Sequence, residues 1–243
     1  MCNVYFKNED ATGLLRALPD RSVDLVLTDP PYGISRSTNF SSGQPTGRDT
    51  DRFRVSMDFG EWDCGGDLSP VIAEFYRVLR PHGSVVCFYD LWKIGTLKEI
   101  LEGAGFRQAR FLEWIKTNPV PLNSKSNYLT NAREAAVSAV KGDRPVFHSE
   151  YDNAVYSFPI CHDRGRFHPT QKPLALIREL VRKHSDSGGG VILDCFAGSA
   201  TTAVAAFLEG RSFIGCEIDR GYYCKAVRRL KETGITDCGK LPW

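Results

Sequence analysis

Short apolar segments alternate along the chain with stretches of helical periodicity, and this alternation constrains the fold more than any other sequence feature. The predicted strands are residues 23–28, 84–89, 111–116, 135–141, 191–193 and 213–217. The predicted helices are residues 12–17, 69–79, 94–104, 174–183, 201–208 and 220–233. Because the strands are apolar almost throughout, both faces of their sheet are expected to be covered. The pattern predicts an α/β fold with a mostly parallel sheet.

Composition fits one globular domain over residues 1–243, with 42% hydrophobic and 25% charged residues. The amino terminus lacks the architecture of a signal peptide, and no apolar run approaches the length of a membrane-spanning helix. The sequence therefore predicts a cytoplasmic protein with reduced thiols and no membrane association.

Eight cysteines raise the question of a metal site, but no two of them form a C-x-x-C pair. Cys87 and Cys195 sit inside apolar runs, where a thiol behaves as a small hydrophobe. Cys161, His162 and His168 lack a fourth ligand at a standard spacing. We therefore expect no bound metal.

Two long segments interrupt the alternation of strands and helices. Residues 33–67 are polar with little periodicity, and a loop of that length is usually disordered or functional. Residues 117–166 are irregular and rich in Asn, Pro and charge. Around them, residues 107–172 contain ten Lys or Arg and six Asp or Glu, although the whole chain carries a net charge of only +2. Taken alone, this local excess is more typical of a solvated face than of a binding surface.

Asp29-Pro30-Pro31-Tyr32 directly follows the predicted strand 23–28. In open α/β sheets, ligands bind at the carboxyl ends of the strands. The prolines fix φ and donate no hydrogen bond, so the backbone is stiff and its carbonyls stay available as acceptors. A carboxylate, a rigid carbonyl and an aromatic ring can accept the hydrogens of a planar amino group and stack on its heterocycle. A plain strand-terminating turn is the alternative.

Residues 194–202, with the sequence DCFAGSATT, form a second such strand end. Their small residues let a ligand approach the backbone, and the following helix offers free N–H groups. Glu217 lies about twenty residues further on, at the next strand end, where nucleoside-binding sheets hold the ribose hydroxyls. Ala200 stands where a phosphate-binding loop needs lysine, and Gly198 alone cannot make a G-x-G-x-x-G fingerprint. A structural turn is again the alternative.

Together these residues resemble the β class of DNA amino-methyltransferases. Asp29-Pro30-Pro31-Tyr32 is similar to the catalytic motif of that family, and residues 194–202 to its cofactor motif Asp-Pro-Phe-x-Gly-Ser-Gly-Thr-Thr. His168-Pro169-Thr170-Gln171-Lys172-Pro173 is similar to a third motif, which lies just before the cofactor motif. The catalytic motif comes first, as in the circularly permuted β-class order. Three matches in one order argue against coincidence.

The resemblance implies a Rossmann-like fold with a mostly parallel seven-stranded sheet, helices on both faces, and S-adenosylmethionine as cofactor. It assigns catalysis to Asp29, Pro30, Pro31 and Tyr32. It places these residues in the cofactor site: Asp10, Ala11, Asp29, Thr170, Lys172, Asp194, Phe196, Gly198, Ser199, Thr201 and Glu217. Cys195 and Ala200 depart from the family pattern, which has Pro and Gly there. These departures put the loop backbone in doubt more than the cofactor.

Residues 117–166 occupy the place of the target-recognition region in this family, and residues 33–67 are predicted to form a mobile loop over DNA. Phosphate contacts are expected from Arg36, Arg52, Lys125, Arg133 and Arg144. The recognition region is short, which favours a homodimer. Double-stranded DNA is the expected substrate, and a cognate restriction endonuclease is a further expected partner.

The predicted reaction is methyl transfer to the N6 amino group of adenine, with the target base flipped out of the duplex. Asp29 favours adenine over cytosine-N4, because the cytosine enzymes more often carry Ser there. Two other interpretations stay open. One is a glutamine-modifying protein methyltransferase, which usually carries Asn-Pro-Pro-Tyr and the other motif order. The other is a non-catalytic DNA-binding relic of the fold.

Overall fold

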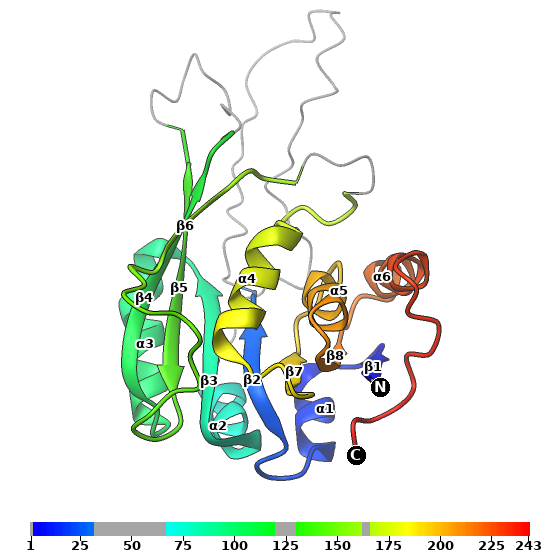
Figure 1. The fold of residues 1–243 in the computed structure, drawn as a ribbon, viewed down its shortest axis with the longest axis horizontal. Helices are drawn as coiled ribbons and strands as arrows, with labels where there is room; N and C mark the ends of the chain where they lie inside the picture. Colours follow the sequence, from blue (N-terminus) through cyan, green and yellow to red (C-terminus); the bar gives the residue numbers. More distant parts are fainter. Residues whose placement is uncertain (1, 32–66, 120–129, 162–165) are drawn as a thin grey trace, which may run out of the picture. The chain divides into compact units, whose positions relative to one another are not determined.

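A computed structural model describes residues 2–31, 67–119, 130–161 and 166–243, and nearly all of them belong to one compact unit, Met1–Pro30 with Asp67–Trp243. An eight-stranded sheet runs through this unit in the order β1-β8-β7-β2-β3-β5-β4-β6 (Figure 1). Its strands are β1 (Val4–Lys7), β2 (Val23–Thr28), β3 (Leu79–Tyr89), β4 (Arg107–Lys116), β5 (Arg133–Val140), β6 (Val155–Phe158), β7 (Val191–Asp194) and β8 (Ser212–Cys216). Within this sheet, β5 runs antiparallel to both neighbours, and the other pairs are parallel.

The prediction of a mostly parallel α/β sheet is confirmed, but the expected number of seven strands is wrong. The strands that the apolar pattern does not predict are β1 and β6, the two edge strands, each four residues long. Such short segments have too few residues to show a periodicity. They are strands because β1 pairs with β8 and β6 pairs with β4. Residues 117–166 therefore contribute two strands to the sheet, β5 and β6.

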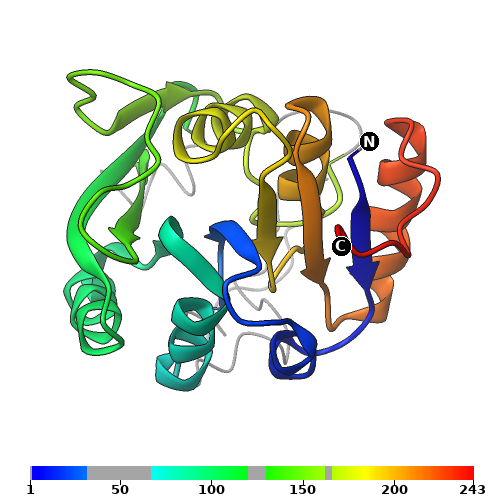
Figure 2. The same cartoon turned by 60° about the horizontal axis from the view of Figure 1, so that its bottom comes forward.

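Helices cover both faces of the sheet, as predicted. On one face lie α1 (Ala11–Ala17), α2 (Ser69–Val78) and α3 (Ile94–Gly103), the last preceded by the 3-10 helix η3 (Leu91–Lys93). On the other lie α4 (Leu174–His184), α5 (Thr201–Leu208) and α6 (Arg220–Glu232). Figure 2 shows the sheet between the two sets of helices. Because apolar side chains of the central strands point both ways, each set packs on its own buried cluster.

The order of the strands reverses between β2 and β7, which lie side by side although far apart in sequence. From β2 the chain continues to β3 on one side, and from β7 it continues to β8 on the other. The parallel register pairs Leu25 with Ile192 and Val26 with Leu193. This register brings the carboxyl ends of both strands to one edge. Such a switch point is where open α/β sheets bind ligands.

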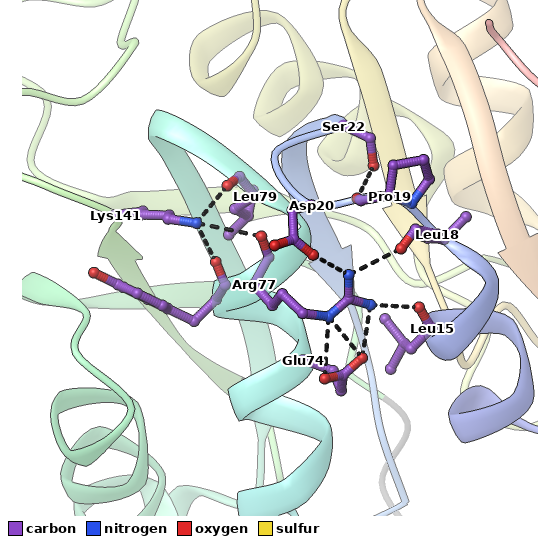
Figure 3. Close-up of polar contacts among 10 residues, drawn as sticks. Leu15, Leu18, Pro19, Asp20, Ser22, Glu74, Arg77, Leu79 and Lys141 are labelled. Carbon is purple, nitrogen blue, oxygen red and sulfur yellow. Dashed lines mark hydrogen bonds and ion pairs between the residues drawn. The ribbon is translucent and has the colours of Figure 1, made fainter.

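Two cations hold the opposite, amino-terminal edge of the sheet together (Figure 3). Arg77 of α2 donates to the carbonyl oxygens of Leu15 and Leu18, at 2.7 and 2.9 Å, near the end of α1. Lys141 follows β5, and its Nζ donates to the Leu79 carbonyl oxygen at 2.7 Å. These bonds join carbonyl oxygens at the end of α1 and just after α2 to side chains of neighbouring elements. The contacts of Arg77 and Lys141 at this edge therefore stabilise the fold.

Candidate active site

Asp194, the last residue of β7, organises the loop between β7 and α5. Its Oδ1 accepts from the Thr28 hydroxyl at 2.7 Å and from the Phe196 backbone N–H at 3.1 Å. Its Oδ2 accepts from the Thr202 hydroxyl at 2.7 Å. Burial raises the pKa of Asp194 to about 6, although these donors favour the ionised form. Asp194 therefore joins β2 to the loop of residues 195–200, here called the cofactor-type loop, and fixes the shape of that loop.

The loop after Asp194 turns through two left-handed residues, Gly198 with φ 51° and Ala200 with φ 57°. A Cβ at Gly198 would lie 3.2 Å from Nε2 of His168, so the loop packs tightly against the His168–Pro173 motif. Ala200 keeps the left-handed conformation without the freedom of the glycine that the family pattern has there. The sequence departure at this position therefore leaves the turn of the loop in place.

Glu217 follows β8 and holds the same loop from the side. Its two carboxylate oxygens each accept a backbone N–H at 2.8 Å, one from Gly198 and one from Asp219. Burial raises its pKa. Asp10 lies at the same edge because β1 pairs with β8, and its Oδ1 caps α1 by accepting from the Gly13 N–H at 2.9 Å. Ala11 is the first residue of that helix.

Ser199 and Thr201 are held by a residue that the sequence analysis does not single out. Arg229 of α6 donates to the Ser199 carbonyl oxygen at 2.9 Å and to the Thr201 hydroxyl at 2.8 Å. No local pattern marks Arg229, because its role depends on the packing of α6 against the loop. Thr202 was also missed, although the cofactor motif that contains it was a usable signal.

Asp29 lies beside Lys172 at the end of β2. Lys172 donates to Asp29 Oδ2 and also lies 3.0 Å from Glu134 Oε2. Burial raises the pKa of Asp29 to about 6 against the opposing effect of the Lys172 charge. The ammonium predicted to line the cofactor site is therefore bonded to the predicted catalytic carboxylate. Glu134 was missed because it lies in the segment interpreted as a recognition region.

The structure describes several further residues that the motifs predict for the site. Thr170 Oγ1 is 3.2 Å from His168 Nδ1, and the His168 ring packs on Tyr222 with 4.4 Å between centroids. Burial lowers the pKa of His168 to about 4, so this imidazole is neutral at pH 7. Pro30 is buried and Phe196 half-buried. Pro31 belongs to a second unit, Pro31–Gly66, of which it is the one described residue.

Several predicted DNA contacts cannot be placed. Tyr32, Arg36, Arg52, Lys125 and residues 33–66 of the predicted loop lie outside the described residues. Arg133 begins β5 at the same edge as Asp29, where it is exposed and pairs with Glu113 at 2.9 Å.

Arg144, a predicted DNA contact, lies away from Asp29 and Arg133. It follows the other end of β5, and its carbonyl oxygen lies 2.8 Å from His82 Nδ1, at the amino-terminal edge. Because β5 is antiparallel to β3, its carboxyl end lies at the amino-terminal edge of the sheet and its amino end lies beside Asp29. The structure therefore does not bring Arg144 together with the site.

The described part of the chain holds no group of three His, Cys, Asp or Glu side chains arranged to bind a metal ion. Nor does any helix in that part have the length and apolar character needed to cross a membrane. The seven described cysteines are free.

The chemistry of the site fits a cationic nucleoside cofactor. The carboxylates of Asp10 and Glu217 lie at one edge and can accept hydroxyl hydrogens of a ribose. Four acids, Asp10, Asp29, Asp194 and Glu217, make this edge favourable for a positive charge. In the third motif, Gln171 is buried, and its Oε1 has no hydrogen-bond partner among the described residues, so an acceptor remains available there.

This fold and this set of acids around a left-handed loop define an S-adenosylmethionine-dependent methyltransferase. The chain belongs to the DNA methylase family of N6 and N4 amino-methyltransferases, whose profile matches residues 23–228. The family uses S-adenosylmethionine, so the predicted cofactor is confirmed.

Relatives and solved structures agree with this assignment. The chain is 30% identical to the Type II methyltransferase M2.DpnII of Streptococcus pneumoniae, over 95% of the chain and 90% of that relative. It is also 30% identical to the putative methylase YubD of Escherichia coli (strain K12), over 93% and 89%. The M1.HpyAVI–SAM complex matches with a TM-score of 0.69 and 27% identity, covering 93% of the chain and 100% of that structure. The cytosine-N4-specific PvuII DNA methyltransferase shares the fold, with a TM-score of 0.71 at 17% identity over 100% of the chain and 89% of its own.

Proposed function

We propose that the chain methylates the N6 amino group of adenine in double-stranded DNA, on a base flipped out of the duplex. The observation that carries this proposal is the position of Asp29. Its carboxylate lies at the end of β2 next to β7, whose Asp194 shapes the loop predicted to hold the cofactor. An acceptor for an amino hydrogen and a methyl-donor site therefore share one edge of the sheet. A base stacked in a duplex cannot reach such an edge, which supports flipping.

The chemistry requires the chain to activate a poor nucleophile. When bound, S-adenosylmethionine supplies an electrophilic methyl group on a positively charged sulfur. Asp29 and the Pro30 carbonyl accept the two amino hydrogens, which favours a pyramidal nitrogen with its lone pair directed at that methyl group. With the cofactor bound, forming the new N–C bond would break the methyl carbon–sulfur bond, leave its electron pair on sulfur and release one proton from the nitrogen. Asp29, with a pKa of about 6, can accept this proton and pass it to water.

Analysis of the methylated nucleoside tests the proposal. DNA from a host that expresses the chain would be digested to nucleosides and separated by mass spectrometry, with a host expressing Asp29→Ala as control. We expect N6-methyladenine in the first sample and none above background in the second. N4-methylcytosine alone would show that the chain acts on cytosine. Absence of any modified base, despite cofactor binding, would support a non-catalytic role.

The partners and location follow from the same assignment. We propose DNA contacts by Arg133 at the described edge and by Arg36, Arg52 and Lys125, together with recognition through residues 117–166 and closure of residues 33–67. The Type II names of two relatives support a cognate restriction endonuclease, and the short recognition region supports a homodimer. A DNA substrate supports a cytoplasmic location.

A further inference from the structure

Four charged side chains of alternating sign form a continuous chain through the site. Lys116, the last residue of β4, has its Nζ 2.8 Å from Glu134 Oε1. The other oxygen of Glu134, Oε2, lies 3.0 Å from Lys172 Nζ, and Lys172 donates to Asp29 Oδ2. The chain of charges therefore runs from the adjacent strands β4 and β5 to the candidate catalytic carboxylate after β2.

Lys172 is the most deeply buried member of this chain, with 8% of its side chain exposed. An ammonium at such depth requires anionic partners, because its removal from water is costly. Asp29 and Glu134 both provide one, and the face of the Phe88 ring lies 4.9 Å from the ammonium. Glu134 and Asp29 therefore share one cation.

Glu134 restricts the position of the Lys172 ammonium, which Asp29 alone cannot do. Lysine reaches its partners on a flexible four-carbon stem, so one carboxylate does not determine where the ammonium lies. Glu134 belongs to β5, where its backbone is paired with Trp114 of β4, and Lys116 holds its second oxygen. The position of Glu134 is therefore set by the sheet.

We propose that Glu134 is a positioning residue, which holds Lys172 so that the Asp29 carboxylate keeps the orientation needed to accept the amino hydrogen. This proposal rests on the catalytic role proposed above for Asp29. In this proposal Glu134 acts on Asp29 through Lys172 and is not itself a catalytic residue.

The charge of Glu134 has a second, opposite effect. Among the described residues, the charged groups that act most strongly on the pKa of Asp29 are Lys172, Glu134 and Asp194. Lys172 favours the ionised carboxylate, whereas the two acids disfavour it. Removal of the Glu134 charge alone therefore lowers the pKa of Asp29 as long as Lys172 stays in place. Displacement of Lys172 would instead raise that pKa.

Two substitutions separate position from charge. Glu134→Gln keeps an acceptor for Lys172 and removes the charge, whereas Glu134→Ala removes both. For Glu134→Ala we expect kcat about 10- to 100-fold below wild type, the size of effect that misplacement by about 1 Å produces. Glu134→Gln should recover most of this loss, and its kcat should fall with acid at a lower pH than wild type. KM for S-adenosylmethionine should stay at the wild-type value in Glu134→Gln, because Lys172 keeps its acceptor there.

Glu179→Ala is the matched control. Its carboxylate is 28% exposed, like that of Glu134, and pairs with Lys183 at 2.5 Å, but it lies on α4 outside the site. We expect wild-type kcat for this variant. Thermal unfolding and cofactor binding would be measured for every variant.

Asp29→Asn, measured in parallel, keeps the two proposals apart. Full activity of Asp29→Asn would remove the catalytic role of Asp29 itself. An inactive Asp29→Asn together with wild-type kcat for Glu134→Ala would remove only the positioning role. If Glu134→Ala does not fold, the pH dependence of kcat for Glu134→Gln tests the proposal instead. The proposal is overturned if the fall of kcat on the acid side occurs at the wild-type pH or at a higher pH.

Discussion

The Thr28 hydroxyl donates a 2.7 Å hydrogen bond to Asp194 Oδ1, and the two residues are 166 positions apart in the chain. This bond joins the last residue of β2 to the last residue of β7, the two strands at which the sheet order reverses. The proposed catalytic segment begins one residue after Thr28, and the cofactor-type loop begins one residue after Asp194. Together with the parallel pairing of β2 and β7, this buried bond fixes the proposed catalytic segment next to the cofactor-type loop.

Asp29→Ala should abolish methyl transfer and leave cofactor affinity nearly unchanged, because this carboxylate acts on the amino group. Isothermal calorimetry with S-adenosylmethionine and a transfer assay on the same preparation would test this. Complete loss of cofactor binding in a folded Asp29→Ala protein would place Asp29 in the cofactor site instead.

The rate should depend on pH through Asp29. Its pKa is raised to about 6, so the active carboxylate form predominates above that value and is lost as the pH falls through it. We expect kcat to be level above pH 7 and to fall about tenfold per pH unit well below 6. Asp194 also has a pKa of about 6, so a slope approaching two would indicate that both acids take up a proton. A rate that is constant down to pH 5 would contradict the prediction.

Glu217→Gln should weaken cofactor binding while DNA binding stays in place. Loss of hydrogen bonds to a charged group costs about 1.5–3 kcal/mol, or about 10- to 150-fold in Kd. Because Glu217 also accepts from Gly198 and Asp219, thermal unfolding would be measured to separate affinity from folding. An unchanged dissociation constant would exclude the ribose assignment.

Arg133 and Arg144 form a matched pair for mapping the DNA surface, since they lie at opposite edges of the sheet. Arg133→Ala should weaken DNA binding and make the salt dependence shallower by about one unit, as expected for one lost phosphate contact. Arg144→Ala should leave both quantities at wild-type values. The reverse result would place the DNA at the amino-terminal edge.

Lys141→Met should destabilise the fold without affecting the site. Burial lowers the pKa of Lys141, yet its ammonium donates to the Tyr76 and Leu79 carbonyls at 2.5 and 2.7 Å. Methionine keeps the stem but removes the donors, so we expect a loss of about 1–3 kcal/mol in the free energy of unfolding, measured with urea. The exposed Lys98 is the control, and Lys98→Met should change stability by less than about 0.5 kcal/mol.

The central strands could be predicted from the sequence because they are buried on both faces. The predicted limits of β2 agree with the structure, those of β7 differ by one residue at one end, and those of β8 differ by one residue at both ends. β3 begins at Leu79, five residues before its predicted start, because Arg80-Pro81-His82-Gly83 is typical of a turn. Pairing of Leu79 with Val23 nevertheless extends the strand.

The motifs placed Asp29, Lys172, Asp194 and Glu217 at one edge, and the structure brings their elements together there. Their partners were not predictable in the same way. Lys172 reaches Asp29 across 143 residues, and Glu134 joins them from an antiparallel strand. Such contacts depend on the register of the sheet, for which a single sequence has no local signal.

The antiparallel course of β5 bears on how specificity could be changed. The chain leaves β4 at Lys116 and returns to β5 at Arg133, and the Lys116 N–H donates to the Ala132 carbonyl oxygen at 2.8 Å. This hydrogen bond holds the end of β4 next to the start of β5. A foreign segment of different length could therefore be inserted between the two strands without a change in their pairing. A chimera would have to retain Lys116 and Glu134, the residues flanking the splice, because they belong to the charged chain that reaches Asp29. The proposed recognition segment could thereby be exchanged without a change to the proposed catalytic residues.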